Sequence, residues 1–339
     1  MSTHTDSPTD VSTILRALND SRLANRELTA GSHAATMNFI VFVDDAAHRP
    51  WVLERAQVIV EKHPARLIVF DSTGATTGVD ISTIVRQVGE SPVVSERADI
   101  GVGSLDNRTI GNIAQELAVP DIPTILWWSG ARLLKSRTFA WLTQLASTVV
   151  VDSSGKARDE ETILELGAFS SRFPAVTLHD LAFMRLAPWR DIIAQFFDDP
   201  SLRQDLFSIE RVTIASGSEA EALYLAGWLG SRLSWTPVGR DRLLDRRGSS
   251  VHLVLKEEGE QRRVGSVTLE AGGSHYRAAL SPDDTNVVRL CVEGARRKDD
   301  WYVPLSNIEN TTLIERAFLT ASSDDIFETS LETVRALLA

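Results

Sequence analysis

Cysteine is almost absent from this chain of 339 residues, which contains only Cys291. A single cysteine excludes an intrachain disulfide and a cysteine-based metal site. Cys291 stands in the apolar run from Val287 to Val292, so we expect it to be a small buried hydrophobe. Chemistry that needs two thiols is therefore excluded within the chain.

Long apolar runs are also missing. The longest stretches, such as Phe39 to Val43 and Thr124 to Trp128, are far too short to cross a bilayer. The first ten residues are polar and acidic and lack the apolar segment of a signal peptide. The sequence therefore predicts a soluble, cytoplasmic protein without a membrane partner.

Basic residues are fewer than acidic residues. Lys and Arg number 35 against 46 Asp and Glu, which gives a net charge of −11 and a pI near 5.2. Such a protein repels phosphate backbones unless a local basic patch reverses the field. The densest basic stretch, Arg240 to Arg247, is interrupted by Asp241 and Asp245. We therefore expect no nucleic-acid partner.

Complete motifs for catalysis or phosphate binding are lacking as well. Gly101-Val102-Gly103 begins like a dinucleotide fingerprint, but Asp106 stands where the third glycine should be. The segment Asp152 to Lys156 ends in Gly-Lys but lacks the upstream glycine of a phosphate loop. The seven histidines include no pair at metal-binding spacing with a carboxylate. No catalytic residue, cofactor site or metal ligand is predicted.

His179-Asp180 is the one pair that suggests a catalytic dyad. No serine or cysteine nucleophile elbow accompanies it. Adjacent residues on a helix point about a quarter-turn or more apart, which is a poor arrangement for an oriented couple. We expect a helix start instead, with Asp180 favouring the positive helix end.

The apolar pattern alternates between strand-like and helix-like segments from about residue 37. Strands bounded by turn formers alternating with amphipathic helices imply crossover connections and a mostly parallel sheet. Residues 80–104 are interpreted as one or two strands with turns. The expected strands are Met37–Val43, Arg66–Phe70, Pro123–Trp128 and Thr148–Val151, and the expected helices are Pro50–Lys62, Asn107–Val119 and Arg137–Ala146.

The composition changes towards short strands near Pro237. Before this point we expect a helix from His179 to Phe197, and a second one that begins with the capping box Ser218-Glu219-Ala220-Glu221. After it, turn formers separate four strand-like runs, which suggests an antiparallel meander. The runs are Val251–Lys256, Arg263–Glu270, His275–Leu280 and Val287–Val292, followed by a helix from about Asp324 to Leu338.

These patterns predict an α/β fold with a mostly parallel sheet flanked by helices, and a smaller β-rich, α+β region behind it. The expected parts are an N-terminal tail and helix (1–29), an α/β domain (30–236), and a smaller domain made of a β-meander and a helix (237–339).

Tryptophan is unusually frequent, with eight residues against three tyrosines. Trp127 and Trp128 close a predicted strand, so their side chains point to opposite faces of the sheet. Trp189 and Arg190 combine residue types that are enriched at binding hot spots. Core packing competes with an interface role at each tryptophan, and Arg190 could instead pair with Asp191 or Asp180 within the fold.

Five segments match those of a known protein family in the same order. His63-Pro64-Ala65-Arg66 is similar to a His-Pro-Ser-Arg segment, with Ala65 in place of serine. Pro120 to Gly130 is similar to a Pro-Asp-Leu-Pro and Trp-Trp-x-Gly segment. The other three are Val150–Ser153, His179–Asp198 and Ala222–Leu229, so the matches span about residues 36–236. With these segments the chain resembles the glucose-6-phosphate dehydrogenase assembly protein (OpcA) family.

This resemblance implies a non-catalytic assembly factor or allosteric activator that binds glucose-6-phosphate dehydrogenase and supports NADPH production by the pentose phosphate pathway. Redox control through several cysteines, attributed to photosynthetic members, does not carry over to a chain with one cysteine. The residues proposed to contact the partner are Trp127, Trp128, Arg185, Trp189 and Arg190.

One alternative stays open. Open α/β sheets bind ligands beyond the carboxyl ends of their strands. An enzyme or sensor for a sugar phosphate or a nucleotide would use a strand-end cleft lined by Asp71–Gly74, Trp127–Arg132 and Asp152–Lys156.

Overall fold

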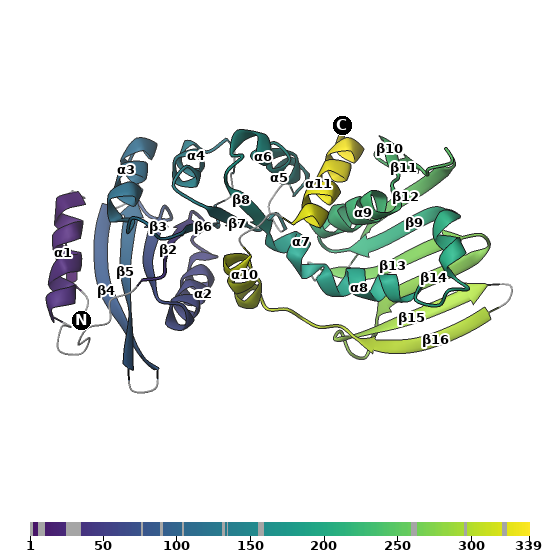
Figure 1. The fold of residues 1–339 in the computed structure, drawn as a ribbon, viewed down its shortest axis with the longest axis horizontal. Coiled ribbons are helices and arrows are strands. Elements are labelled where there is room, and N and C mark those ends of the chain that lie inside the picture. Colours follow the sequence, from purple (N-terminus) through teal and green to yellow (C-terminus); the bar gives the residue numbers. More distant parts are fainter. Residues whose placement is uncertain are drawn as a thin grey trace. The chain divides into compact units, whose positions relative to one another are not determined.

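The structure is a computed structural model (Figure 1). It describes residues 3–5, 11–24, 35–75, 77–88, 91–103, 105–130, 133, 135–154, 159–258, 263–294, 297–320 and 324–339. The chain divides into two compact units. The first comprises residues 1–151, 169–179 and 314–321, and the second comprises residues 152–168, 180–313 and 322–339.

The first unit is built on a sheet whose central strands are parallel, as predicted. Strand β2 pairs in parallel with β3 on one side and β6 on the other, and β5 and β7 extend the parallel part outwards. The strand order is β1-β4-β5-β3-β2-β6-β7-β8. The strands are β1 (Thr3–Thr5), β2 (Met37–Val43), β3 (Ala65–Asp71), β4 (Thr77–Val88), β5 (Ser91–Val102), β6 (Thr124–Trp128), β7 (Thr148–Val151) and β8 (Thr177–Asp180).

Helices cover both faces of this sheet, which explains why its strands are continuous apolar runs (Figure 1). All residues of β2, β6 and β7 are buried. Trp51 of α2 packs edge-on against Trp127, and Phe139 of α4 packs edge-on against Trp128. The helices are α1 (Val11–Ala24), α2 (Arg49–Lys62), α3 (Asn107–Leu117), α4 (Arg137–Thr143) and α6 (Phe169–Arg172).

The second unit contains a mixed sheet in the order β10-β11-β12-β9-β13-β14-β15-β16. Three of the four predicted runs, β13, β14 and β15, pair in antiparallel order as expected, and β16, which was not predicted, extends them. However, β9 lies between β12 and β13 and pairs with β12 in parallel. The strands are β9 (Ile209–Ser216), β10 (Thr236–Gly239), β11 (Arg242–Leu244), β12 (Ser250–Glu257), β13 (Val264–Ala271), β14 (Ser274–Leu280), β15 (Val287–Gly294) and β16 (Arg297–Pro304).

One face of the second sheet is covered by helices α9 and α11, which pack together (Figure 1). Gly227 of α9 permits this approach, because an added Cβ would lie 2.5 Å from the carbonyl oxygen of Ser330 on α11. The last helix begins at the expected Asp324 cap. The helices in or entering this unit are α5 (Asp159–Leu166), α7 (Leu181–Arg185), α8 (Ala187–Gln195), a 3₁₀ turn at Arg203–Phe207, α9 (Glu219–Leu233), α10 (Asn310–Leu319) and α11 (Asp325–Leu338).

The single helix expected from His179 to Phe197 is wrong. His179 and Asp180 close strand β8, and α7 and α8 follow as two short helices. Leu186 caps both helices, and Pro188 stands in the first turn of α8. Proline has no N–H to donate to the preceding turn, so the helix cannot run through it.

The units also differ from the domains expected at a boundary near residue 237. Strand β9 pairs with β12 and β13, so residues 209–236 lie in the second unit rather than in the first. Such pairing brings together segments far apart in the sequence, and local patterns do not reveal it. The β-rich unit is therefore larger than expected.

Candidate functional site

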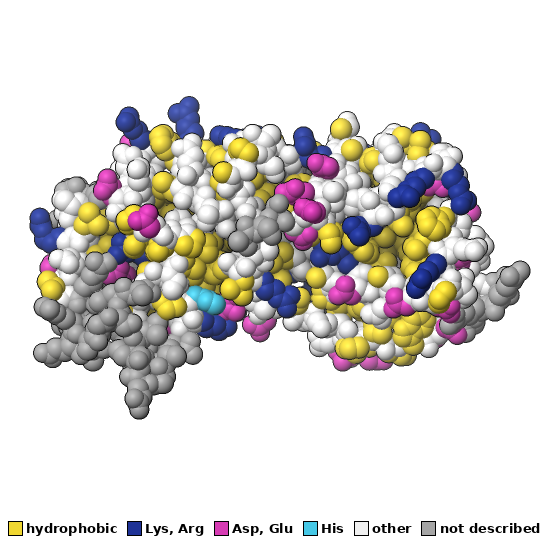
Figure 2. Space-filling model, viewed as in Figure 1, with side chains coloured by type: hydrophobic (Ala, Val, Ile, Leu, Met, Phe, Trp, Pro, Cys, Tyr) yellow, Lys and Arg dark blue, Asp and Glu magenta, His cyan; other side chains and the backbone are white. Residues whose placement is uncertain are grey.

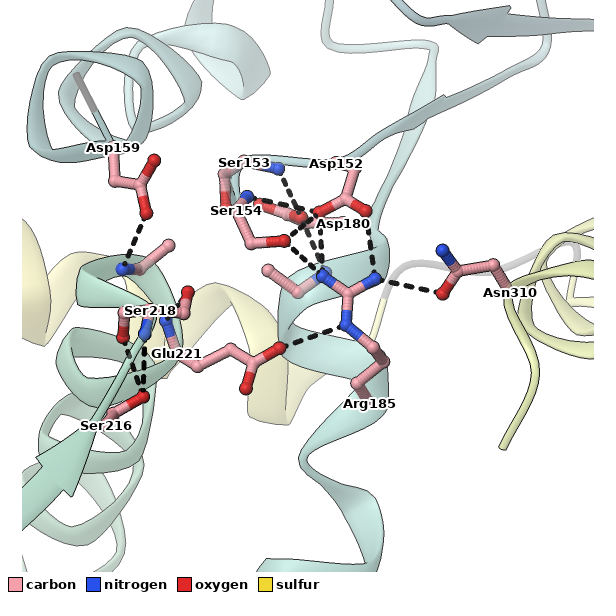
Figure 3. Close-up of polar contacts among 12 residues, drawn as sticks. Asp152, Ser153, Ser154, Asp159, Asp180, Arg185, Ser216, Ser218, Glu221 and Asn310 are labelled. Atoms are coloured by element: carbon pink, nitrogen blue, oxygen red, sulfur yellow. Dashed lines mark hydrogen bonds and ion pairs between the residues drawn. The ribbon is translucent and has the colours of Figure 1, made fainter. Parts of the chain in front are cut away.

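The most densely bonded polar group of the second unit is the guanidinium of Arg185, the last residue of α7 (Figure 3). Asp152 accepts from both terminal nitrogens, at 2.8 and 2.9 Å. Glu221 accepts from Nε at 3.0 Å, Asn310 accepts from Nη1 at 3.1 Å, and Ser154 accepts from Nη2. These five bonds match the five N–H donors of an arginine, so none is left over for a further partner.

The charges around Arg185 are coupled. Burial disfavours the charge of Arg185, but Asp152 and Glu221 outweigh it and raise its pKa. Burial likewise opposes ionisation of Asp152, yet Arg185 and the hydrogen bonds of Ser154 hold its pKa below the ordinary value. Burial raises the pKa of Glu221 to about 7 despite the neighbouring arginine. One cation thus faces two carboxylates of unequal acidity.

Asp180 forms the second part of this cluster and confirms the expected helix start. Its Oδ1 accepts from the backbone N–H groups of Ser153 and Ala182, and caps α7. Its Oδ2 accepts from the Tyr224 hydroxyl at 2.7 Å. Burial, together with the charge of Asp152, raises the pKa of Asp180. We define the Arg185 cluster as Asp152, Ser154, Asp180, Arg185, Glu221, Tyr224 and Asn310.

The predicted capping box at the start of α9 is half correct. Ser218 accepts from the backbone N–H of Glu221 at 3.3 Å, as a helix cap does. The Glu221 side chain does not reach back to Ser218, because it bonds Arg185 (Figure 3). Ser216 takes its place and accepts from the Ser218 N–H at 3.0 Å. The carboxylate that could have capped the helix therefore binds the half-buried Arg185 instead.

The two tryptophans of β6 lie on opposite faces of the first sheet, as predicted. Trp127 stacks with Phe39 and is 2% exposed. Trp128 stacks with Phe42 at a centroid distance of 4.0 Å and is equally buried. Both indoles are core residues of this unit. Their proposed contact with a partner stays a prediction that would require the core to open.

Trp189 and Arg190 of α8 have separate environments. Trp189 is buried. The guanidinium of Arg190 lies over the ring of Phe183 at 4.1 Å, a cation–π contact. Burial lowers the pKa of Arg190, while the charges of Asp324 and Asp191 oppose the shift. Its Nη1 is buried without a hydrogen-bond partner in the described part of the chain.

The strand ends of the first sheet carry carboxylates where a dinucleotide-binding fold needs glycines. Strand order reverses between β2 and β6, the usual ligand position in open α/β sheets. The loop from β2 to α2 begins with Asp44 and Asp45. Asp71, at the end of β3, accepts from Thr73 and Arg49. Four residues of the alternative cleft lie outside the described residues: Ala131, Arg132, Gly155 and Lys156.

Sequence patterns did not single out the face of the second sheet that lies opposite α9 and α11, which we call the outer face. Cys291 points to this face and is half-buried rather than buried, so the expectation of a core position is wrong. It lines a hollow of about 580 Å³ together with Thr268, His275, Arg277 and Arg289. Alternation along β14, where Tyr276 and Ala278 are buried and His275 and Arg277 are exposed, is the signal that could have revealed this face.

The described residues support neither a metal site nor a membrane-spanning helix. They contain no group of three His, Cys, Asp or Glu side chains that could hold a metal ion. None of the helices within the described ranges is both long and apolar enough to span a bilayer. On the face shown in Figure 2, Lys and Arg side chains are scattered among Asp and Glu side chains.

Two family models match consecutive parts of the chain. The glucose-6-phosphate dehydrogenase subunit N-terminal domain matches residues 56–168, and the corresponding C-terminal domain matches residues 176–331. A protein from Synechocystis sp. named OxPP cycle protein OpcA is 35% identical over 131 residues, which cover 38% of this chain and 27% of that protein. A protein of the same name from Nostoc punctiforme is 31% identical over 191 residues, covering 54% and 41%. The chain thus aligns with well under two thirds of these relatives' length.

Solved structures show a similar fold at low identity. A 3-ketoreductase from Actinomadura kijaniata, in its open conformation with TDP-benzene and NADP, has a TM-score of 0.53 at 12% identity. The alignment covers 90% of this chain and 98% of the reductase. A second structure of that reductase with the same ligands gives 0.52 at 11% identity, covering 89% and 95%. This likeness concerns the fold alone. From the two matching models and the named relatives, we conclude that the chain belongs to the OpcA family of glucose-6-phosphate dehydrogenase assembly proteins.

Proposed function

We propose that this protein is a non-catalytic partner of glucose-6-phosphate dehydrogenase, which it binds in order to promote the active oligomer. The observation that carries this proposal is the pair of family models, both described as domains of a glucose-6-phosphate dehydrogenase subunit. Activation would raise NADPH output from the oxidative pentose phosphate pathway.

The charge at the strand ends supports a non-catalytic role. A pyrophosphate bound in an open α/β sheet lies against a glycine-rich turn and the N-terminus of the following helix. Here the corresponding turn carries Asp44 and Asp45, and α2 starts after them with His48 as its N-cap. Two carboxylates at this point repel a dinucleotide phosphate.

The activation mechanism follows from the thermodynamic linkage between binding of the partner and the oligomeric equilibrium of the dehydrogenase. A partner that binds the active oligomer more tightly than the inactive forms shifts the population towards it. The extent of activation cannot exceed the ratio of the two affinities, and a hundredfold shift requires about 2.7 kcal/mol of differential binding. No chemical step by the activator is needed.

Co-purification with the cognate dehydrogenase tests the proposal. We expect a stable complex, and a dehydrogenase rate that rises to a plateau as the protein is added. Absence of both binding and rate change, with and without glucose 6-phosphate and NADP, would contradict the proposed function.

The second candidate function is a sensor or enzyme that binds a sugar phosphate or nucleotide at the strand ends. Arg49 favours it, because this cation lies in the first turn of α2 and its side chain is 41% exposed. Asp71, however, already pairs with this guanidinium.

A further inference from the structure

The second sheet has one face that no helix of the described residues covers. Along β13, β14 and β15 roughly every second side chain is buried, and the intervening ones are more exposed. On the buried side, Tyr276 packs against Phe196 and Phe197, which follow α8. Cross-strand register aligns three of the outward positions in one row: Thr268 lies opposite Arg277, and Arg277 lies opposite Cys291. The row defines the centre of the outer face.

This outer face is hollowed at the same row. The hollow has a volume of about 580 Å³, and its lining includes Thr268, Arg277, Ala279 and Cys291. Small-molecule sites enclose most of their ligand within a cavity. The outer face of an open sheet offers a wide, accessible surface instead, so its geometry suits a macromolecular partner better than a metabolite.

Arg277 lines the hollow and has no ion-pair partner among the described residues. Its neighbour Arg289 is paired with Asp300 across β15 and β16. Arg277 makes no ion pair or hydrogen bond with any residue in the described ranges, although the chain as a whole carries a charge of −11. His275, Arg289 and Glu293 line the same hollow. An exposed guanidinium without an ion-pair partner is suited to bind a carboxylate in two-point geometry.

We propose that the outer face of β13, β14 and β15 is the docking surface for a carboxylate-bearing surface of the dehydrogenase, with Arg277 as its central contact. The inference rests on the proposed function and identifies where the partner binds. Charge complementarity selects this occupant, because Arg277 lacks an acidic partner within the described chain. Docking would bury Cys291, which is adjacent to Arg277 in the row.

Cys291 allows this surface to be probed in the unmodified protein. It is the only cysteine of the chain. We expect saturating dehydrogenase to slow alkylation of Cys291 by iodoacetamide at least tenfold, as followed by mass spectrometry of the peptide that contains it. Unchanged alkylation kinetics in a complex shown to be fully formed would overturn the docking surface.

Charge reversal gives an independent test. Arg277→Glu should weaken binding to the dehydrogenase at least tenfold. Arg277→Lys should retain part of the wild-type affinity, because it keeps the positive charge but lacks the two-point hydrogen-bonding geometry of a guanidinium. Arg232→Glu is the matched control, since Arg232 is exposed on α9, on the covered side of the sheet. The affinity of the Arg232→Glu variant for the dehydrogenase should stay within twofold of that of the wild type.

The outcomes separate the two proposals. If the wild-type protein binds no dehydrogenase, the proposed function fails. If the wild type binds, while Arg277→Glu binds equally well and Cys291 stays reactive, the function stands and the docking surface is wrong. If Arg277→Glu does not fold, as judged by its melting temperature, the Cys291 experiment on the wild-type complex decides.

Discussion

Two arginines within the family-like segments are bound inside their own units. Arg66, from the His-Pro-Ala-Arg segment, bonds Glu96 through two nitrogens and the carbonyl oxygen of Leu117 through the third. Arg185 is bonded through all five of its N–H groups. Such arginines cannot contact a partner without giving up bonds in the fold. A recurrent charged residue is therefore not by itself evidence for an interface.

Removing Arg185 should destabilise the second unit strongly. Arg185→Ala leaves the buried Glu221 and the half-buried Asp152 without a cation. Removing one partner of a fully buried pair costs about 3–5 kcal/mol, and we expect a loss at or below the lower end of this range because Asp152 is in part solvated. Arg185→Lys should lose less, although an ammonium group has three donors where five bonds are made. Chemical denaturation measures both. Arg232→Ala, at an exposed position, serves as control and should change the free energy of unfolding by less than about 0.5 kcal/mol. Wild-type stability in Arg185→Ala would show that the cluster is not formed.

Glu221 should make stability depend on pH. Its pKa is about 7 in the fold and 4.5 without the fold, so the folded state binds an extra proton between these values. The stabilisation is complete below about pH 4.5 and is lost as the pH rises through about 7. A shift of this size corresponds to at most about 3 kcal/mol.

Glu221→Gln removes this titration and keeps an oxygen for the Nε–H of Arg185, while Asp152 still balances the charge. The free energy of unfolding of Glu221→Gln, relative to wild type, should therefore increase between pH 4.5 and 8. Denaturation curves at half-unit pH intervals measure it. Parallel pH profiles for the two proteins would exclude a titrating Glu221.

Among the elements, α9 shows how small residues determine packing. An added Cβ at Gly227 would lie 2.5 Å from the Ser330 carbonyl oxygen and 2.5 Å from Val334 Cγ2, both on α11. A backbone atom cannot move aside as easily as the end of a side chain. The close α9–α11 pair therefore depends on glycine at this position.

Gly227→Ala should lower the free energy of unfolding by about 1–3 kcal/mol, because overpacking exceeds the gain in helix propensity. Gly239→Ala is the matched control, since the nearest atom to its added Cβ is 3.9 Å away. The melting temperatures of the two variants give the comparison. An unchanged value for Gly227→Ala would mean that α9 and α11 separate readily.

The elements also show what the sequence could and could not predict. Buried apolar runs predicted β2, β3, β6 and β7, because a strand covered on both faces needs no alternation. The break at Pro188 was missed, although proline is a local signal. The place of β9 between β12 and β13 could not be found locally, since it depends on pairing with distant segments. For the same reason the partners of Arg185, from three separate segments, could not be assembled from spacing alone.

At the scale of the whole molecule, the fold resembles that of a nucleotide-dependent reductase, whereas the family models describe dehydrogenase subunit domains. Fold does not determine function, because function depends on the residues at the site. In the first sheet those residues are Asp44 and Asp45, where a glycine-rich turn would accommodate phosphate. The two lines of evidence are therefore compatible, because a shared architecture does not imply a shared site.

This difference leads to a test on the isolated protein. A ligand that binds only the folded state raises the melting temperature, by an amount that grows with the ratio of its concentration to its Kd. We expect no rise in melting temperature with glucose 6-phosphate or NADP at 1 mM. A ligand that did bind with a Kd near 0.1 mM would stabilise the fold by about 1.4 kcal/mol at this concentration. The cognate dehydrogenase itself serves as positive control and should raise the unfolding midpoint of the complex. A rise with NADP alone, accompanied by its loss in Arg49→Ala, would identify a strand-end ligand site and favour the sensor or enzyme, because Arg49 is the cation in the first turn of α2.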